Sequence, residues 1–181
     1  MKCKEMPDPK VKLITCVLYP ADNGGEDWFF WTLEKLKAIW GEHENVSTPV
    51  PFTTTDYYRD IAPRLMRRFI CFSGLAKAGE LPDWKHASIE IETESRNPRI
   101  VNIDPGYVDG ARLVLASTKD HAHRIYLRDG IFAEVTMRFR FGKWAPFDYT
   151  FPDFASGVYD NFLSAARASW LKEKNEKKHI D

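Results

Sequence analysis

The chain has 181 residues, of which 44% are hydrophobic and 29% are charged, the balance of an ordinary globular protein. Its 26 Lys and Arg residues equal its 26 Asp and Glu residues, and this neutrality argues against a dedicated nucleic-acid-binding protein. Three cysteines without paired spacing predict a reducing compartment and no zinc knuckle, and the lack of a signal peptide or long apolar run predicts a cytoplasmic protein.

We expect a flexible lead-in over residues 1–10, one α+β domain over residues 11–175 and a charged tail over residues 176–181. The apolar run 13–19 is typical of a central strand that is covered on both faces. A helix is expected next, because apolar residues recur at helical spacing from Phe29 to Trp40 and Gly41 follows them.

Residues 46–52 predict a second strand, which two prolines place near an edge, and residues 68–72 predict a third. Residues 82–95 fit a strand or a helix, of which we take the helix, and residues 99–103 predict a fourth strand. The order is that of a ferredoxin-like βαββαβ core.

This core is extended by a strand over residues 111–117, a C-terminal β-hairpin and a terminal amphipathic helix from about residue 156. The hairpin pairs residues 123–128 with 131–141 around Asp129-Gly130, a strong signal for a two-residue turn. Pairing from this turn sets Arg128 opposite Ile131 and Tyr126 opposite Ala133. It also places the alternating residues from Ile131 to Phe141 on one core face, and His123 diagonal to Glu134 on the other face.

Residues 118–124 are the densest group of reactive side chains in the sequence. Lys119 and Arg124, together with a protonated histidine, could hold a phosphate or a carboxylate. The alternative is a solvated connector without a ligand. The pair of His123 and Glu134 likewise fits either a site, in which the carboxylate orients the imidazole, or an outer face with a chance contact.

Asn102 and Asp104 point the same way by strand alternation, at the end of the fourth predicted strand. Asp104-Pro105-Gly106 by itself favours a turn, although an acid and an amide at a strand end are also common in binding sites. Asp104, His121, His123 and Glu134 are ligand types for a divalent ion, but neither an HExxH motif nor a cysteine framework supports a metal. The cluster of Arg64, Arg67 and Arg68 is typical of a solvated face.

Residues 102–107, 111–120, 123–127 and 131–136 resemble a bacterial family known only as domain of unknown function 4416. Residues 11–13, 55–58, 67–69 and 149–153 are similar to it too, so the resemblance covers nearly the whole chain. Members are often labelled GTP-binding proteins, yet no GxxxxGK[ST] loop is present, because Glu80 and Leu81 stand where Lys and Ser/Thr are needed.

The family pattern falls on Gly106 and on all of our candidate site residues, whereas His121 stands where members often carry another residue. We assign acid–base roles to Asp104, His123 and Glu134. The predicted ligand-binding residues are Thr55, Asp56, Tyr57, Asn102, Tyr107, Lys119, Arg124 and Tyr126.

The first hypothesis is therefore a pocket for an anionic small molecule, such as a nucleotide or a phosphorylated metabolite, with no cofactor identified. The second is a non-catalytic interaction or scaffold module, which would expose an aromatic patch formed by Trp144, Phe147, Tyr149 and Phe151. The third is a metal-dependent hydrolase. The sequence makes no strong case for nucleic acid or a membrane, and it leaves the oligomeric state open.

Overall fold

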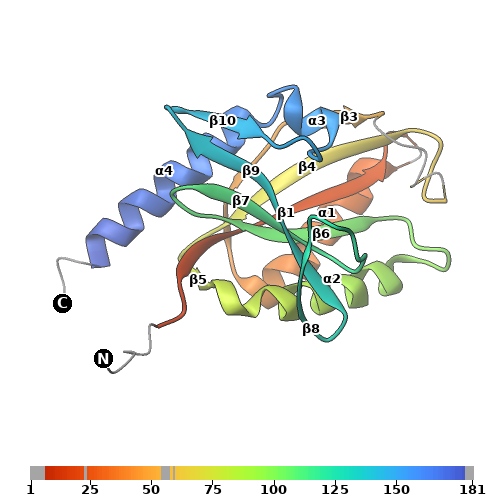
Figure 1. Cartoon of the computed structure of the whole chain (residues 1–181). Coiled ribbons are helices and arrows are strands. Elements are labelled where there is room, and N and C mark those ends of the chain that lie inside the picture. Colours follow the sequence, from red (N-terminus) through yellow and green to blue (C-terminus); the bar gives the residue numbers. More distant parts are fainter. Residues whose placement is uncertain (1–6, 23, 54–57, 59, 178–181) are drawn as a thin grey trace.

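A computed structural model of the chain describes residues 7–22, 24–53, 58 and 60–177 (Figure 1). The elements are β1 (Lys10–Pro20), α1 (Gly25–Trp40), β2 (His43–Val46), β3 (Val50–Phe52), β4 (Leu65–Phe72), β5 (Ala76–Lys77), α2 (Leu81–Ser95), β6 (Asn102–Val108), β7 (Arg112–Ser117), β8 (Ile125–Arg128), β9 (Ile131–Arg140), β10 (Lys143–Pro146), α3 (Pro152–Ala155) and α4 (Asp160–Lys177). The helix that we chose over a strand for residues 82–95 is confirmed as α2.

The strands form one ten-stranded sheet in the order β10-β9-β7-β6-β1-β4-β2, with β3 on β4, β5 on β1 and β8 on β9. All of these pairs are antiparallel. The α+β class is thus confirmed, with a large antiparallel sheet and, within the described ranges, four α-helices. The sheet is larger than the predicted core, because β7, β9 and β10 continue it beyond β6.

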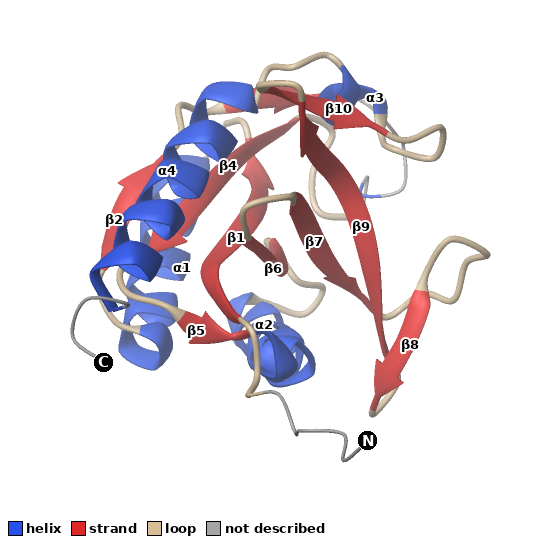
Figure 2. Ribbon diagram, turned by 60° about the vertical axis from the view of Figure 1, so that its left-hand side comes forward, coloured by secondary structure: helices blue, strands red, loops and turns tan. Residues whose placement is uncertain are grey.

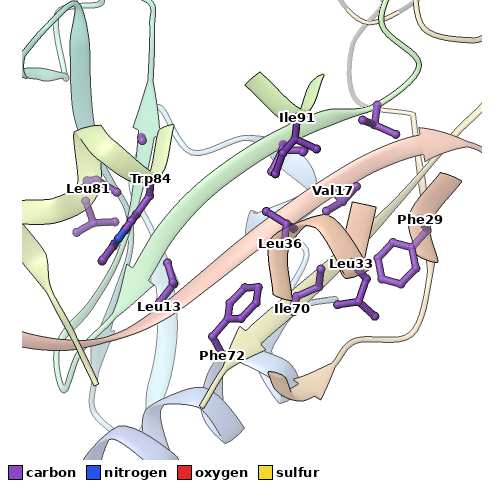
Figure 3. Close-up of a cluster of buried hydrophobic side chains, with 14 of the residues drawn as sticks. Leu13, Val17, Phe29, Leu33, Leu36, Ile70, Phe72, Leu81, Trp84 and Ile91 are labelled. Atoms are coloured by element: carbon purple, nitrogen blue, oxygen red, sulfur yellow. The ribbon is translucent and has the colours of Figure 1, made fainter. Parts of the chain in front are cut away.

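Helices cover both faces of the sheet, so β1 is buried on both sides, as its continuous apolar sequence predicted (Figure 2). Leu13 and Val17 of β1 pack in one core with α1 and α2, which Figure 3 shows in close-up. Ile14 and Cys16 point the other way, into a second core with Phe162 and other residues of α4. The alternation of a strand thus divides one apolar run between two cores.

The prediction of a single core face along β9 is wrong, because β9 contains a β-bulge. Leu113 pairs with Met137 while Val114 pairs with Val135, so one extra residue, Thr136, is inserted into β9. An extra residue reverses the alternation of faces. Ala133 and Val135 therefore pack on the α1–α2 core, whereas Met137 and Phe139 pack on the α4 core. The predicted core residue Phe141 is 85% exposed.

The predicted turn at Asp104-Pro105-Gly106 is also wrong, because the segment lies within β6. β6 and β7 are paired only at Gly106↔Leu115, Tyr107↔Val114 and Val108↔Leu113, so the ladder between them ends at Gly106. Pro105, which has no N–H to donate, is compatible with a strand because it lies beyond the end of this ladder. Gly106 lets the two backbones approach, because a Cβ atom on it would stand 2.2 Å from the carbonyl oxygen of Val114. Before Gly106, the strands β6 and β7 separate.

The hairpin turn is where the sequence placed it, but its register shifts after the first pair. Arg128 faces Ile131 as predicted, whereas Tyr126 faces Phe132 instead of Ala133, with an irregularity at Leu127. The shift ends β8 at Ile125, so His123 and Arg124 lie in the preceding turn and not in the strand. The predicted backbone pairs of His123 and Arg124 with β9 are therefore absent from this part of the described chain.

Candidate functional site

A cavity of about 340 Å³ opens where β6 and β7 have separated. Its lining includes Asn102 and Asp104 of β6, Leu115 to Ser117 of β7, and Glu134 and Thr136 of β9. The other lining residues, from α2, β1, β3, β4, α3 and the connecting segments, are Cys16, Phe52, Tyr58, Arg67, Lys85, Ile89, Glu92, Arg99, Thr118, Lys119, Arg124, Phe151 and Phe154. The cavity thus draws on segments from most of the chain.

Two side chains of α2 take the place of the strand that β6 lacks along this stretch. The ammonium group of Lys85 donates to the carbonyl oxygen of Ile103 at 2.7 Å, and the backbone N–H of Ile103 donates to the Glu92 carboxylate at 2.7 Å. Both backbone groups of Ile103 are thereby satisfied without β7, which a buried strand requires. Because Lys85 and Glu92 lie 3.7 Å apart and are both buried, they also form an ion pair beneath the cavity.

The floor of the cavity is formed by β6 together with Lys85 and Glu92 of α2, and Asp104 is the acidic residue that β6 contributes to it. Its carboxylate accepts from Lys85 at 2.9 Å and from the Asn102 amide at 2.8 Å. Burial alone would raise the pKa of Asp104, but Lys85 and Arg67 outweigh burial and hold that pKa below its ordinary value of 3.8. Burial also lowers the pKa of Lys85, but Asp104 and Glu92 outweigh it and leave that pKa above 10.5. At neutral pH the floor therefore contains an ionised carboxylate beside an ammonium group.

Arg67 lies on the same face, as a buried cation between aromatic rings. Its guanidinium binds the carboxylate of Asp153 and lies 4.3 Å from the ring centroid of Phe52 and 5.4 Å from that of Phe154. Its Nε atom has no hydrogen-bond partner among the described residues. Only 5% of Arg67 is exposed, so the solvated face predicted for the arginine cluster is wrong at this residue, and the reason is its pairing with Asp153.

The turn before β8 forms the opposite wall of the cavity. Arg124 donates through Nε to Glu134 at 2.9 Å, and through Nη1 to the Ser117 hydroxyl at 2.7 Å and the Lys119 carbonyl at 3.1 Å. Three contacts fix one guanidinium and hold the turn against the end of β7. Hydrogen-bond donors with positive charge are thus concentrated at this wall.

Glu134 joins the cavity to a histidine at its edge. Its side chain is buried, and its Oε2 atom lies 3.0 Å from Nε2 of His123. The outer solvated face that the sequence allowed for this pair is therefore wrong for Glu134, because the bulge of β9 and the turn at Arg124 enclose it. A carboxylate that accepts at Nε2 keeps the proton of a neutral imidazole on Nε2 and leaves Nδ1 as an acceptor.

Four nearly parallel rings extend outward from this pair. His123 stacks on Tyr149 with 4.2 Å between ring centroids, Tyr149 stacks on Phe147 at 5.2 Å, and His121 stacks on His123 at 5.8 Å. Tyr149 also donates to the carbonyl of Val135, which anchors the stack to β9. The stack fixes the plane of the His123 imidazole.

The structure brings most of the predicted site residues together, although the predicted register was wrong. Asn102, Asp104, Lys119, Arg124 and Glu134 line the cavity, and His123 contacts Glu134 at its edge. The other predicted residues are not gathered there. Tyr107 packs against the core that β1 forms with α1 and α2, and Tyr126 is exposed on β8. Thr55, Asp56 and Tyr57 lie outside the described residues.

Sequence reasoning missed Lys85, Glu92 and Arg99. A signal was present for the first two, because Lys85 and Glu92 are seven residues apart and lie on the buried stripe of α2 with Leu81, Trp84, Ser88 and Ile91. Charged residues on the apolar stripe of a helix indicate buried partners. Arg99 pairs with Glu92 from the segment before β6, and no local pattern marked it.

Two findings bear on the other sequence hypotheses. Among the residues that the structure describes, no group of three or more His, Cys, Asp or Glu side chains is arranged to hold a metal ion. Within the same residues, none of the helices combines the length and the apolar composition that crossing a membrane requires.

Neither the curated proteins nor the solved structures include one that is detectably similar to this chain. A protein-family model does match it, over residues 9–170, and it describes a domain of unknown function, DUF4416. The match includes every described residue that lines the cavity and both histidines of the ring stack. On this evidence the chain belongs to the DUF4416 family.

Proposed function

We propose that the cavity between β6 and β7 binds an anionic small molecule, such as a nucleotide or a phosphorylated metabolite. The observation that carries the proposal is the charge of the lining, where five cationic side chains face three carboxylates, while Asp153, outside the lining, pairs with one of the cations, Arg67. The cations are Arg67, Lys85, Arg99, Lys119 and Arg124, and the carboxylates are Glu92, Asp104 and Glu134. The volume of about 340 Å³ falls within the ordinary range of small-molecule sites.

The wall at residues 117–124 is the part of the cavity best suited to an anion. Hydroxyl groups of Ser117 and Thr118 line it beside Lys119 and Arg124, and such groups bind phosphate in many proteins. The contacts of Arg124 with Ser117 and Glu134 hold its guanidinium in place before a ligand arrives. This preorganisation lowers the cost of ordering the site on binding.

A catalytic role would fall to Asp104, His123 and Glu134, as the sequence suggested. Of the three, we assign the role of proton acceptor to His123, because Glu134 binds its Nε2 atom and Nδ1 is the ring nitrogen that Glu134 leaves available. Asp104 would accept a hydrogen bond from a reacting group, since its low pKa keeps it ionised.

The test is a thermal-shift screen with inorganic phosphate, pyrophosphate, phosphorylated sugars and nucleotides, including GTP. A ligand at 100 times its Kd stabilises the folded state by about 2.7 kcal/mol, enough for a clear rise in Tm. We expect Arg124→Gln and Lys119→Met to abolish the rise. Arg128→Gln is the matched control, because Arg128 lies four residues after Arg124 in the sequence but pairs with Asp83 and Asp129 outside the cavity. If no anion raises Tm, the proposal fails.

In this proposal the strands before β7 and the strands from β7 onward have different roles. Strands β6-β1-β4-β2 with α1 and α2 have the strand order and antiparallel pairing of a ferredoxin-like unit, and we suggest this description for residues 10–108. The extension by β7 and β9 would then supply the anion-binding wall. A ferredoxin-like unit alone would lack Lys119, Arg124 and Glu134.

A second candidate function, protein interaction, is favoured by one observation. Ile125, Tyr126 and Leu127 follow one another on β8 and are 68%, 58% and 39% exposed. Exposed apolar residues in a row on an edge strand are a common basis for binding another chain. The patch that the sequence predicted for this role is wrong at Trp144, which is buried against α4. Light scattering of the wild type and of Tyr126→Ser would detect self-association through β8.

A further inference from the structure

The cavity has two chemically different ends, and we infer that its ligand is a phosphorylated polyol or sugar, whose hydroxyl groups donate to Asp104 and Asn102 while its phosphate lies at residues 117–124. The inference rests on the proposed function, because it names the class of the anion proposed there. It adds a second recognition element that a simple anion site would not need.

The floor end offers acceptors. The two carboxylate oxygens of Asp104 have about four positions for hydrogen bonds, of which Lys85 and Asn102 fill two. Its side chain keeps 22% of its surface exposed, although the surrounding residues are buried. The amide nitrogen of Asn102 is directed at Asp104, so its amide oxygen remains as an acceptor, to which no described residue donates. A ligand that fits this end must carry donors.

Hydroxyl groups fit these acceptors better than an ammonium group does. Lys85 and Arg67 already compensate the charge of Asp104, and they are the groups that keep its pKa low. A third cation beside them would gain little attraction and would be repelled by both. A hydroxyl group can donate to Asp104 and also accept from a neighbouring cation. Arg67, whose Nε atom has no partner among the described residues, lines the same cavity.

The register of the sheet places these groups on one face. Arg67 and Asn102 both pair with Leu18 of β1, one from each side, and Asp104 pairs with Cys16 two residues away. Neighbouring strands are about 4.8 Å apart, so this floor spans about 10 Å. That width suits several hydroxyl groups on a short carbon chain or a ring.

The opposite end offers donors and positive charge. Arg124 is fixed there by Ser117 and Glu134, and Lys119 and Thr118 lie beside it in the lining. The lining also includes an apolar wall of Leu115, Phe151 and Phe154, against which the carbon skeleton of a ligand can pack. A volume of about 340 Å³, near the lower limit for small-molecule sites, favours a ligand of this size over a dinucleotide.

Calorimetry with the wild-type chain of 181 residues tests the inference through matched ligands. The probes are inorganic phosphate, propyl phosphate, glycerol 3-phosphate and ribose 5-phosphate. We expect the two hydroxylated phosphates to bind at least about tenfold more tightly than propyl phosphate, because buried acceptors left unpaired by the alkyl chain oppose its binding.

The outcomes separate the inference from the proposal on which it rests. Equal binding of all organic phosphates would overturn the inference and leave the anion site standing. Failure of all four probes to bind would overturn both. Preference for propyl phosphate would also refute the inference, since the apolar wall would then dominate recognition.

Variants give an independent readout. Asp104→Asn is expected to reduce the preference for glycerol 3-phosphate over propyl phosphate severalfold while inorganic phosphate binds as before, because the wall at residues 117–124 is unchanged. Asp148→Asn, an exposed carboxylate outside the cavity, is the matched control and should keep the full preference. If Asp104→Asn is poorly folded, Asn102→Ala serves in its place. An unchanged preference in a folded variant counts against the inference.

Discussion

Gly106 is the residue at which β6 and β7 touch before they separate. A methyl group there would meet the Val114 carbonyl oxygen at 2.2 Å and the Leu115 Cα atom at 3.1 Å, and both are backbone atoms that cannot move alone. We expect Gly106→Ala to lower the free energy of unfolding by about 1–3 kcal/mol, measured by urea denaturation. The loss follows from separation of the two strands.

Gly79→Ala is the matched control for this substitution. Its added Cβ atom would approach only the side chain of Asp8, at 3.2 Å, and this exposed carboxylate can turn away. A loss in Gly79→Ala equal to that in Gly106→Ala would contradict the strand-contact explanation.

Lys85 and Asp104 are expected to be strongly coupled in stability. Lys85→Met removes the ammonium donor of the Ile103 carbonyl and leaves the buried Asp104 carboxylate with Asn102 as its remaining donor among the described residues. Removing one partner of a buried ion pair costs about 3–5 kcal/mol, whereas replacing both costs less. We therefore expect Lys85→Met/Asp104→Asn to lose less stability than the sum of the single variants, in a double-mutant cycle measured with urea. If the losses in the two single variants add up to the loss in the double variant, Lys85 and Asp104 do not stabilise each other.

At the scale of single residues, the sequence alone could identify site residues where different charged and titratable side chains lie close together along the chain, and it could not where their partners are distant. Lys119, His123 and Arg124 lie within six residues, so their gathering could be predicted. Arg67 could not be recognised in this way, because its partner Asp153 is 86 residues distant and its neighbours Arg64 and Arg68 do lie nearer the surface. Whether a charge is buried depends on what packs over it, and local sequence does not contain that information.

At the scale of elements, the replacement of a strand partner by helix side chains leads to a specific prediction. The amide of Ile103 is protected by Glu92 and not by a neighbouring strand. Glu92→Ala is therefore expected to speed hydrogen exchange at Ile103 more than at the residues of β6 that pair with β7, measured by NMR. Glu90→Ala, two residues away on the exposed side of α2, is the control. Uniform acceleration along β6 would instead indicate general destabilisation.

Elements with strong periodicity were predicted well, and the departures have local causes. The helix before Gly41 ends where the sequence placed its end, and the turn at Asp129-Gly130 has both residues at positive φ, as its residue types require. The register beyond that turn was wrong, since an irregularity at Leu127 carries no sequence signature. The bulge at Thr136 was also missed. Apolar and polar residues keep alternating through it in the sequence, although the side chains on either side of it face opposite sides of the sheet from those that the alternation predicts.

At the scale of the whole molecule, the site exists because the sheet is continued past β6 by strands that do not pair with it fully. Two apolar cores pack on opposite faces of the sheet, and the cavity lies where α2, β6, β7 and β9 meet. Strands β7, β8 and β9 of the extension could be predicted, whereas β10 was not. The separation of β6 from β7 depends on Pro105 and Gly106 within a strand, a pair that alone favours a turn. The cavity was therefore not visible in the sequence, although several of its residues were.

Cysteine and tyrosine side chains are buried in both cores in their protonated form, and this predicts that the protein loses stability in alkali. Burial raises the pKa of Cys16 from 9.0 to about 12, and it also raises the pKa values of Tyr19 and Tyr159 above their ordinary 10.0. Above pH 9 the unfolded chain loses these protons while the folded chain keeps them, so unfolding releases protons and becomes easier. Each group contributes a fall of up to about 1.4 kcal/mol per pH unit between its two pKa values.

Urea denaturation between pH 8 and pH 11 measures this fall. Below the ordinary pKa values the contribution of these groups to stability is fully present, and it is lost progressively as the pH rises toward their folded values. Tyr159→Phe should reduce the slope above pH 10, because the phenol that donates to Asp153 is gone. Tyr126→Phe is the control, because Tyr126 is exposed. A free energy of unfolding that stays level up to pH 11 would contradict the dependence on buried thiol and phenol groups, and would require that both cores admit hydroxide without unfolding.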